Sequence, residues 1–241
     1  MSIEWCDHAC LVNERPAAVR VDFRRHEHAP HDELAFALWL RLRLNAPDAA
    51  GLATPAEMER LAALERALAT IEDGGAIAYV GRCTTAGQCD FCFYVADVER
   101  AGEVLRAALA GFAEYTYQWL HHADPEWAHY FEFLFPDPRA LQVIVNRELA
   151  AELALRGDRA EIARPGAHWI HFERELERDA FAVAVRSRGF ACELTRDVEA
   201  DEDFSFALRI ERATTLVAAT LDGEVLELFD LAAAHGGDYD G

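Results

Sequence analysis

The order of strand and helix patterns along the chain constrains its fold more than any other feature. Residues 34–120 read strand-helix-strand-strand-helix-strand, and residues 168–235 read strand-helix-strand-strand-helix again. This order is typical of the ferredoxin-like α/β sandwich. The sequence therefore predicts an α+β protein made of two ferredoxin-like sandwich domains, with antiparallel sheets and helices packed on one face of each sheet.

Local patterns support these elements. Residues 38–44 carry leucine at every second position, which indicates a strand. Thr54-Pro55-Ala56-Glu57 is typical of a helix start, with threonine as the N-cap and proline at the first helical position. The strands expected at 76–83 and 89–96 are joined by a short connection that contains glycine, which favours a hairpin. The aromatic run at 128–135 is predicted to be a further strand.

Glycine and proline residues mark a boundary between the two predicted halves. Gly157, Pro165 and Gly166 interrupt the pattern after a helix that is expected over residues 139–155. We therefore predict an N-terminal α+β domain at residues 1–160 and a second domain at 161–241. No residue-level repeat accompanies the repeated order of elements.

The charge of the chain limits the partners that it can have. It carries 43 acidic and 23 basic residues, a net charge of -20. An acidic surface repels phosphate backbones, so direct nucleic-acid binding is disfavoured and a basic protein surface is the expected partner. No apolar run reaches the ~18 residues that a membrane span needs. Without a basic and apolar leader at its N-terminus, the chain is expected in the cytoplasm.

Several sequence motifs in the C-terminal part resemble one known family. They are His168-Trp169-Ile170-His171-Phe172, Arg188-Gly189-Phe190 at a helix-to-strand turn, and the ending Gly236-Gly237-Asp238-Tyr239-Asp240-Gly241. With them, residues from about 162 to 241 resemble the RraB family, the protein regulators of ribonuclease E. The tail of that family usually continues into Trp-Glu, which this chain lacks. The resemblance implies inhibition of ribonuclease E by the C-terminal part.

The N-terminal part resembles a second family. Tyr79-Val80-Gly81-Arg82-Cys83-Thr84 and Phe91-Cys92-Phe93-Tyr94 are similar to the uncharacterised family called domain of unknown function 695. This resemblance implies no known activity. Together the two resemblances cover nearly the whole chain.

Histidine and cysteine residues leave open an enzyme or a metal-binding protein as the alternative. Two groups contain histidine: His26, His28 and His31, and then His121, His122, Asp124, Glu126 and His129. The cysteines stand at positions 6, 10, 83, 89, 92 and 192 and include a CxxC pattern. Strand alternation places Cys89 and Cys92 on opposite faces. We therefore predict that Cys83, Cys89 and Cys92 do not bind a metal.

Motifs for catalysis and for cofactor binding are missing from the sequence. It contains no G-x-S-x-G nucleophile elbow, no P-loop and no GxGxxG dinucleotide fingerprint. The aromatic residues between positions 115 and 135 lack interleaved arginine and are interpreted as core rather than as a base-stacking surface. The sequence therefore predicts no catalytic residue, no cofactor and no metal site.

Acidic residues near the C-terminus are the candidate partner-binding residues. They are Asp197, Glu199, Asp201, Glu202, Asp203, Asp238 and Asp240. A solvated connection between two strands is the other explanation for the first five. The sequence as a whole favours a non-enzymatic, cytoplasmic regulatory or adaptor protein that inhibits or modulates a ribonuclease by protein–protein binding. Its expected partner is a basic protein surface, with ribonuclease E as the candidate.

Overall fold

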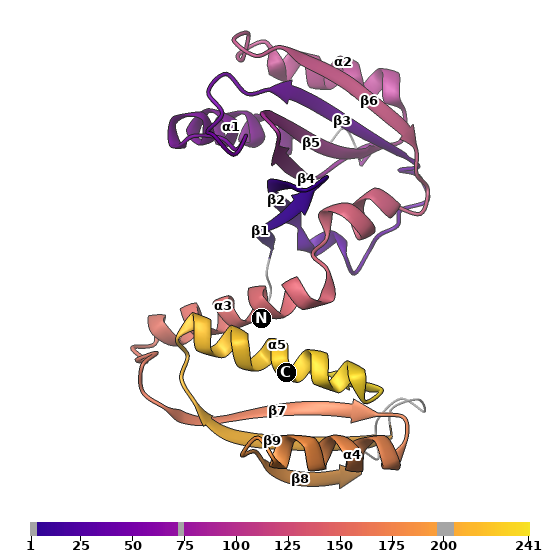
Figure 1. Cartoon of the computed structure of the whole chain (residues 1–241). Helices are drawn as coiled ribbons and strands as arrows, with labels where there is room; N and C mark the ends of the chain where they lie inside the picture. The colour runs from indigo at the N-terminus through magenta and orange to yellow at the C-terminus, as the bar shows by residue number, and fades with distance from the viewer. Residues whose placement is uncertain (1–3, 72–74, 197–204) are drawn as a thin grey trace. The chain divides into compact units, whose positions relative to one another are not determined.

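The chain folds into two α+β units, residues 1–136 and 137–241, each built on its own antiparallel sheet (Figure 1). The structure is a computed structural model that describes residues 4–71, 75–196 and 205–241. The α+β class and the antiparallel sheets that the sequence predicts are confirmed. The more specific ferredoxin-like assignment stays a prediction.

The first unit contains a six-stranded sheet with the order β1-β2-β4-β5-β3-β6. Its strands are β1 (Trp5–Val12), β2 (Arg15–Asp22), β3 (Phe36–Arg43), β4 (Ile77–Thr85), β5 (Gln88–Val95) and β6 (Tyr117–Ala123). Its helices are α1 (Pro55–Ala69) and α2 (Val98–Leu109), with two shorter helical segments, η1 (Phe23–Arg25) and η2 (His129–Leu134).

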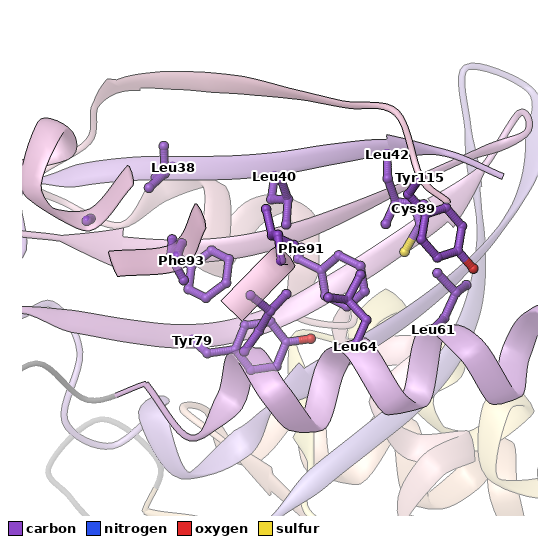
Figure 2. Close-up of a cluster of buried hydrophobic side chains, with 14 of the residues drawn as sticks. Leu38, Leu40, Leu42, Leu61, Leu64, Tyr79, Cys89, Phe91, Phe93 and Tyr115 are labelled. Carbon is purple, nitrogen blue, oxygen red and sulfur yellow. The ribbon is translucent and has the colours of Figure 1, made fainter. Parts of the chain in front are cut away.

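The main core of the first unit lies between the sheet and the helices α1 and α2. Leucines at alternate positions of β3 belong to this core, and Figure 2 shows Leu38, Leu40 and Leu42 in the same buried cluster as residues of α1. They meet Leu61 and Leu64 of α1, which are fully buried. The helix begins with Thr54 and Pro55 as predicted, although the Thr54 hydroxyl donates to the carbonyl of Ala46 rather than capping the helix.

The opposite face of this sheet is covered in part by η2, and here two predictions are wrong. Residues 129–134 form a helical turn instead of a strand, and helices therefore lie on both faces of the sheet. The reason is local, because the Asp124 carboxylate accepts hydrogen bonds from the backbone N–H groups of Ala128 and His129 at the start of the helix. The buried residues Trp127, Tyr130 and Leu134 then recur at helical spacing.

The second unit contains a four-stranded sheet with the order β10-β7-β9-β8. Its strands are β7 (Arg164–Phe172), β8 (Ala191–Arg196), β9 (Phe206–Thr214) and β10 (Gly237–Tyr239), and its helices are α3 (Pro138–Leu155), α4 (Glu175–Arg186) and α5 (Ala218–Ala234). Apolar residues of α4 and α5 pack against one face of the sheet, among them Phe181, Val185 and Leu228. Helices on one face are confirmed for this unit.

Helix α3 belongs to the second unit, where it lies alongside α5 (Figure 1). The Asn146 side chain of α3 donates a hydrogen bond of 3.1 Å to the Asp222 carboxylate of α5. The two compact units divide between Pro136 and Asp137. The boundary that we predict near residue 160 therefore falls inside the second unit, after α3.

Both units share one arrangement of strands. The first unit follows the order β3-α1-β4-β5-α2-β6, and the second follows β7-α4-β8-β9-α5-β10. The four strands of each series lie side by side in their sheet. The first and third strands are the inner pair, β3 with β5 and β7 with β9, and the second and fourth strands lie on either side of that pair. None of the helices in the described part of the chain combines the length and apolar character that a membrane span needs.

Candidate protein-binding surface

The last residues of the chain form an edge strand of the second sheet. Gly236 has a φ of 72°, a left-handed conformation that favours glycine, and it turns the chain from α5 into β10. A Cβ atom on Gly237 would lie 2.4 Å from the ring of Phe172, so only glycine fits there without displacement. The N–H of Asp240 then donates to the carbonyl of Trp169 at 3.0 Å. The two glycines thus allow β10 to lie flat against β7.

A buried polar network holds β10 in place. Nε2 of His168 lies 3.2 Å from the Glu224 carboxylate, which only accepts, so this nitrogen carries the proton and donates. Nδ1 of His168 then accepts from the Tyr239 hydroxyl at 2.7 Å. The second oxygen of Glu224 accepts from Arg212 at 2.6 Å. Burial lowers the pKa of His168, which favours this neutral state.

The sheet face opposite α4 and α5 is exposed to solvent around Trp169. Strand alternation directs Trp169 and His171 of β7 away from the helices, and Trp169 is 39% exposed. Pairing places Arg209 of β9 next to Trp169 and Glu193 of β8 next to Arg209. We call this surface the open sheet face and define it by Trp169, His171, Glu193, Arg209, Glu211, Asp238 and Asp240. In the described part of the second unit, no helix packs on it.

The open sheet face is acidic around its central tryptophan. It carries four carboxylates, from Glu193, Glu211, Asp238 and Asp240, against one guanidinium. Arg209 lies 2.6 Å from Glu211 and 3.6 Å from Glu193, so its charge is already compensated. The Asp240 side chain is 74% exposed and lies 3.8 Å from Nε2 of His171. The face therefore offers an apolar centre within a rim of negative charge.

Two of the residues that the sequence proposes for partner binding, Asp238 and Asp240, lie on the open sheet face. The others, Asp197, Glu199, Asp201, Glu202 and Asp203, fall outside the described residues. Trp169 was missed as a site residue, although its strand alternates with the buried Ile170 and Phe172. A tryptophan on the outer side of such a strand is the signal that points to this surface.

Two family models match the chain. The first, described as Family of unknown function (DUF695), covers residues 4–135, which is more than half of the sequence. The chain belongs to this family. The second, described as Regulator of ribonuclease activity B (RraB), matches residues 143–241. These matches confirm the two-family arrangement that the sequence analysis expected. A comparison with curated proteins found no match.

The cysteines of the DUF695 part lie on both faces of its sheet. Cys89 packs in the core under α1, with its sulfur 3.4 Å from the Thr84 hydroxyl, whereas the Cys92 sulfur lies 3.8 Å from Nε2 of His129 on the other face. The predicted opposite orientation of these two thiols is therefore confirmed. Burial raises the pKa of Cys83 to about 12 and that of Cys89 to about 11, so both stay protonated at neutral pH.

The histidine groups of the DUF695 part pack against aromatic rings. His26 stacks on Phe135 at 4.3 Å between centroids, and His122 lies 4.9 Å from Trp39. Asp124, which the sequence grouped with possible metal ligands, is buried and accepts from the Tyr94 hydroxyl at 2.6 Å. Within the described residues, no three side chains of His, Cys, Asp or Glu come together as a metal-binding group.

One of these histidines is expected to make the stability of the DUF695 part depend on pH. Burial lowers the pKa of His129 from 6.5 to about 4. Below pH 6.5 the unfolded chain therefore binds a proton that the folded chain does not. The contribution of this group to the free energy of unfolding is complete above pH 6.5 and decreases as the pH drops. At pH 4 the free energy of unfolding should be lower by about 3 kcal/mol.

Urea unfolding followed by tryptophan fluorescence at several pH values tests this prediction. The unit holds Trp5, Trp39, Trp119 and Trp127, which are four of the five tryptophans. His129→Gln removes the titrating group and keeps a hydrogen-bond acceptor for Trp39. In this variant the free energy of unfolding should therefore decrease less between pH 6.5 and pH 4 than in the wild type. The matched control is His28→Gln, at an exposed position. An unchanged pH dependence in His129→Gln would contradict the assignment.

Proposed function

We propose that this protein is a non-enzymatic regulator that modulates a ribonuclease by binding it through the open sheet face of the RraB part. The observation that carries the proposal is the match of residues 143–241 to the family Regulator of ribonuclease activity B. Ribonuclease E is the enzyme to test first. The proposal places the protein in the cytoplasm, where such an enzyme meets its RNA.

The make-up of the open sheet face supports a protein partner. An exposed tryptophan surrounded by polar residues is a common arrangement for the centre of a protein interface, where tryptophan contributes much of the binding energy. Trp169 stands on β7, a central strand, with Arg209 on one side and the backbone of Asp240 on the other. This position lets a partner surround it and exclude water from it.

The charge of the open sheet face supports a basic partner. Four carboxylates and one compensated guanidinium give it a negative potential, in a chain with a net charge of -20. Such a surface repels RNA and attracts basic protein surfaces, including the RNA-binding groove of a ribonuclease. The acidic residues Asp197, Glu199, Asp201, Glu202 and Asp203 are proposed to add to this attraction.

Charge attraction makes a kinetic prediction. Asp238→Asn combined with Asp240→Asn should slow association with immobilised ribonuclease E by about fivefold at low salt, and by much less at physiological salt. The dissociation rate should change little, because Asp240 lies at the rim and is 74% exposed. Interferometry at several salt concentrations measures both rates.

The matched control removes two charges from the helical side of the same unit. Glu227→Gln combined with Asp230→Asn changes two exposed residues of α5, whose side chains are 58% and 55% exposed and pair with exposed arginines. This variant has the same net charge as the first and should keep nearly the wild-type association rate. Equal slowing by the two variants would mean that net charge, and not this face, guides the encounter.

A further inference from the structure

We infer that the DUF695 part holds a binding site for a small, planar organic acid, on the sheet face opposite α1 and α2. A pocket of about 710 Å³ opens there between β3, β5, η2 and two hairpin turns. Sites for small molecules have volumes of roughly 300–1,000 Å³ and combine apolar walls with a few fixed polar groups. This inference does not depend on the proposed function of the RraB part.

The floor of the pocket is made by side chains from neighbouring strands. Strand pairing aligns Asp90 of β5 with Arg41 of β3, and Trp39 lies two residues before Arg41 on the same face of β3. The Arg41 guanidinium donates two hydrogen bonds to the Asp90 carboxylate, at 2.8 and 2.7 Å. This bidentate pair fixes both side chains and compensates their charges.

Helix η2 supplies an aromatic wall. His129 and Phe133 are four residues apart and therefore lie on the same side of the helix, with their rings stacked at 4.7 Å and 22°. The indole N–H of Trp39 donates to Nε2 of His129 at 2.7 Å, and the two rings meet edge to face at 4.6 Å. Trp39 is thus held in place before any ligand arrives, which reduces the entropy cost of binding.

Two tight turns make the rim on the other side. The β1–β2 turn contributes Asn13 and the β4–β5 turn contributes Ala86, and the adjoining first residues of β2 and β5 contribute Arg15 and Gln88. Asn13 and Ala86 have φ values of 49° and 53°, so both turns adopt left-handed backbone conformations. Hairpins with such turns are tight and twist with their strands. Asn13 and Gln88 thus bring side-chain amide groups to the lining of the pocket.

Charge identifies the class of ligand. Arg15 lines the pocket and makes no ion pair with any residue that the structure describes, although the chain has a net charge of -20. The other charges of the lining, Arg41 and Asp90, compensate each other. Arg15 therefore leaves a net positive charge at the rim, beside the apolar surfaces of Trp39 and Phe133. A flat apolar body with one carboxylate or phosphate group satisfies both features.

Nuclear magnetic resonance of the full chain tests the site directly. The five tryptophans give five indole N–H signals in a ¹⁵N-labelled sample, and each can be assigned by replacement with phenylalanine. Titration with 2-naphthoate or with 2-naphthyl phosphate should shift the signal of Trp39 in a saturable way. The signal of Trp169, in the RraB part, is the internal control and should not move. Saturable binding of either probe supports the site.

Variants and a neutral probe distinguish binding that depends on Arg15 from nonspecific stacking of the probe on aromatic rings. Arg15→Gln should weaken binding of 2-naphthoate about tenfold, because it removes a charged hydrogen-bond donor. The uncharged 2-naphthamide should bind the wild type about tenfold more weakly than 2-naphthoate does, and should bind Arg15→Gln as it binds the wild type. Arg147→Gln changes an exposed arginine of α3 and should leave binding unchanged. Equal binding of the acid and the amide, or equal shifts at Trp39 and Trp169, would overturn the inference.

Discussion

Replacing Trp169 with alanine is expected to weaken the binding of ribonuclease E by about 30-fold, which corresponds to about 2 kcal/mol. The indole is 39% exposed on the central strand β7, and Arg209 lies next to it on the neighbouring strand β9. A partner that covers the face would remove this indole from water. Loss of the ring would therefore remove the main apolar contact of the interface, and the dissociation rate should rise most.

Leu176→Ala is the matched control for this variant. Leu176 is 83% exposed on α4, on the helical side of the same unit, so it is at least as accessible as Trp169. Its replacement should change the affinity by less than about twofold, because surface residues outside the contact contribute little. Trp169→Ala should also leave amide exchange in β7 and β9 unchanged. Similar losses of affinity in the two variants would contradict the placement of the interface.

Tyr239→Ala is expected to destabilise the RraB part by about 3 kcal/mol or more. Tyr239 is only 6% exposed, packs with the core of this unit, and donates its hydroxyl hydrogen to His168 at 2.7 Å. Tyr239→Phe keeps the ring and removes only the hydroxyl, so Nδ1 of His168 loses its donor in a buried site. The cost of that change should be smaller, about 1–2 kcal/mol.

Hydrogen exchange of the β7 and β9 amides in the full chain measures the loss of stability in the two Tyr239 variants. These central strands report the free energy of unfolding of their own unit. Tyr117→Ala, at a half-buried position on the edge strand β6 of the other unit, is the control and should leave those amides unchanged. An equal loss in the free energy of unfolding for Tyr239→Phe and Tyr239→Ala would show that the packing of the ring contributes nothing to stability. Unchanged exchange in both would show that β10 does not secure the unit.

Much of the fold could be predicted because its signals are local. Alternating leucines mark β3, and Thr54 with Pro55 marks the start of α1. The failures come from longer-range effects. Residues 129–134 contain aromatic residues that favour strands, but the Asp124 carboxylate and the packing of Trp127 on Tyr94 at 4.0 Å select a helix. Helix propensity likewise does not show that α3 packs against α5.

The candidate site could be predicted only in part for the same reason. Asp238 and Asp240 were identified from their charge. The order of elements predicted from the sequence ends with a helix at residue 235 and does not include β10, because this strand has three residues and depends on the contact between Tyr239 and His168. Alternation in β7 shows that one face is buried. It does not show whether the opposite face, with Trp169, is covered.

The pocket of the DUF695 part had no signal in the sequence. Trp39 and His129 are distant in the chain and meet only because η2 folds back over the sheet. The sequence grouped His129 with its neighbours His121, His122 and Asp124 as possible metal ligands. In the structure the Asp124 carboxylate accepts hydrogen bonds from the N–H groups of Ala128 and His129 at the start of η2, and the His129 ring bonds Trp39 of β3 instead.

The central claim, that the RraB part regulates a ribonuclease through its open sheet face, is tested most directly by RNA cleavage. Purified ribonuclease E is mixed with a fluorogenic single-stranded RNA and with increasing amounts of the full chain. We expect the cleavage rate to fall to a plateau, the chain alone to cleave nothing, and Trp169→Ala to need about 30-fold more protein for the same effect. A cleavage rate that no concentration of the chain changes, or a Trp169→Ala variant that acts at the wild-type concentration, would contradict the account.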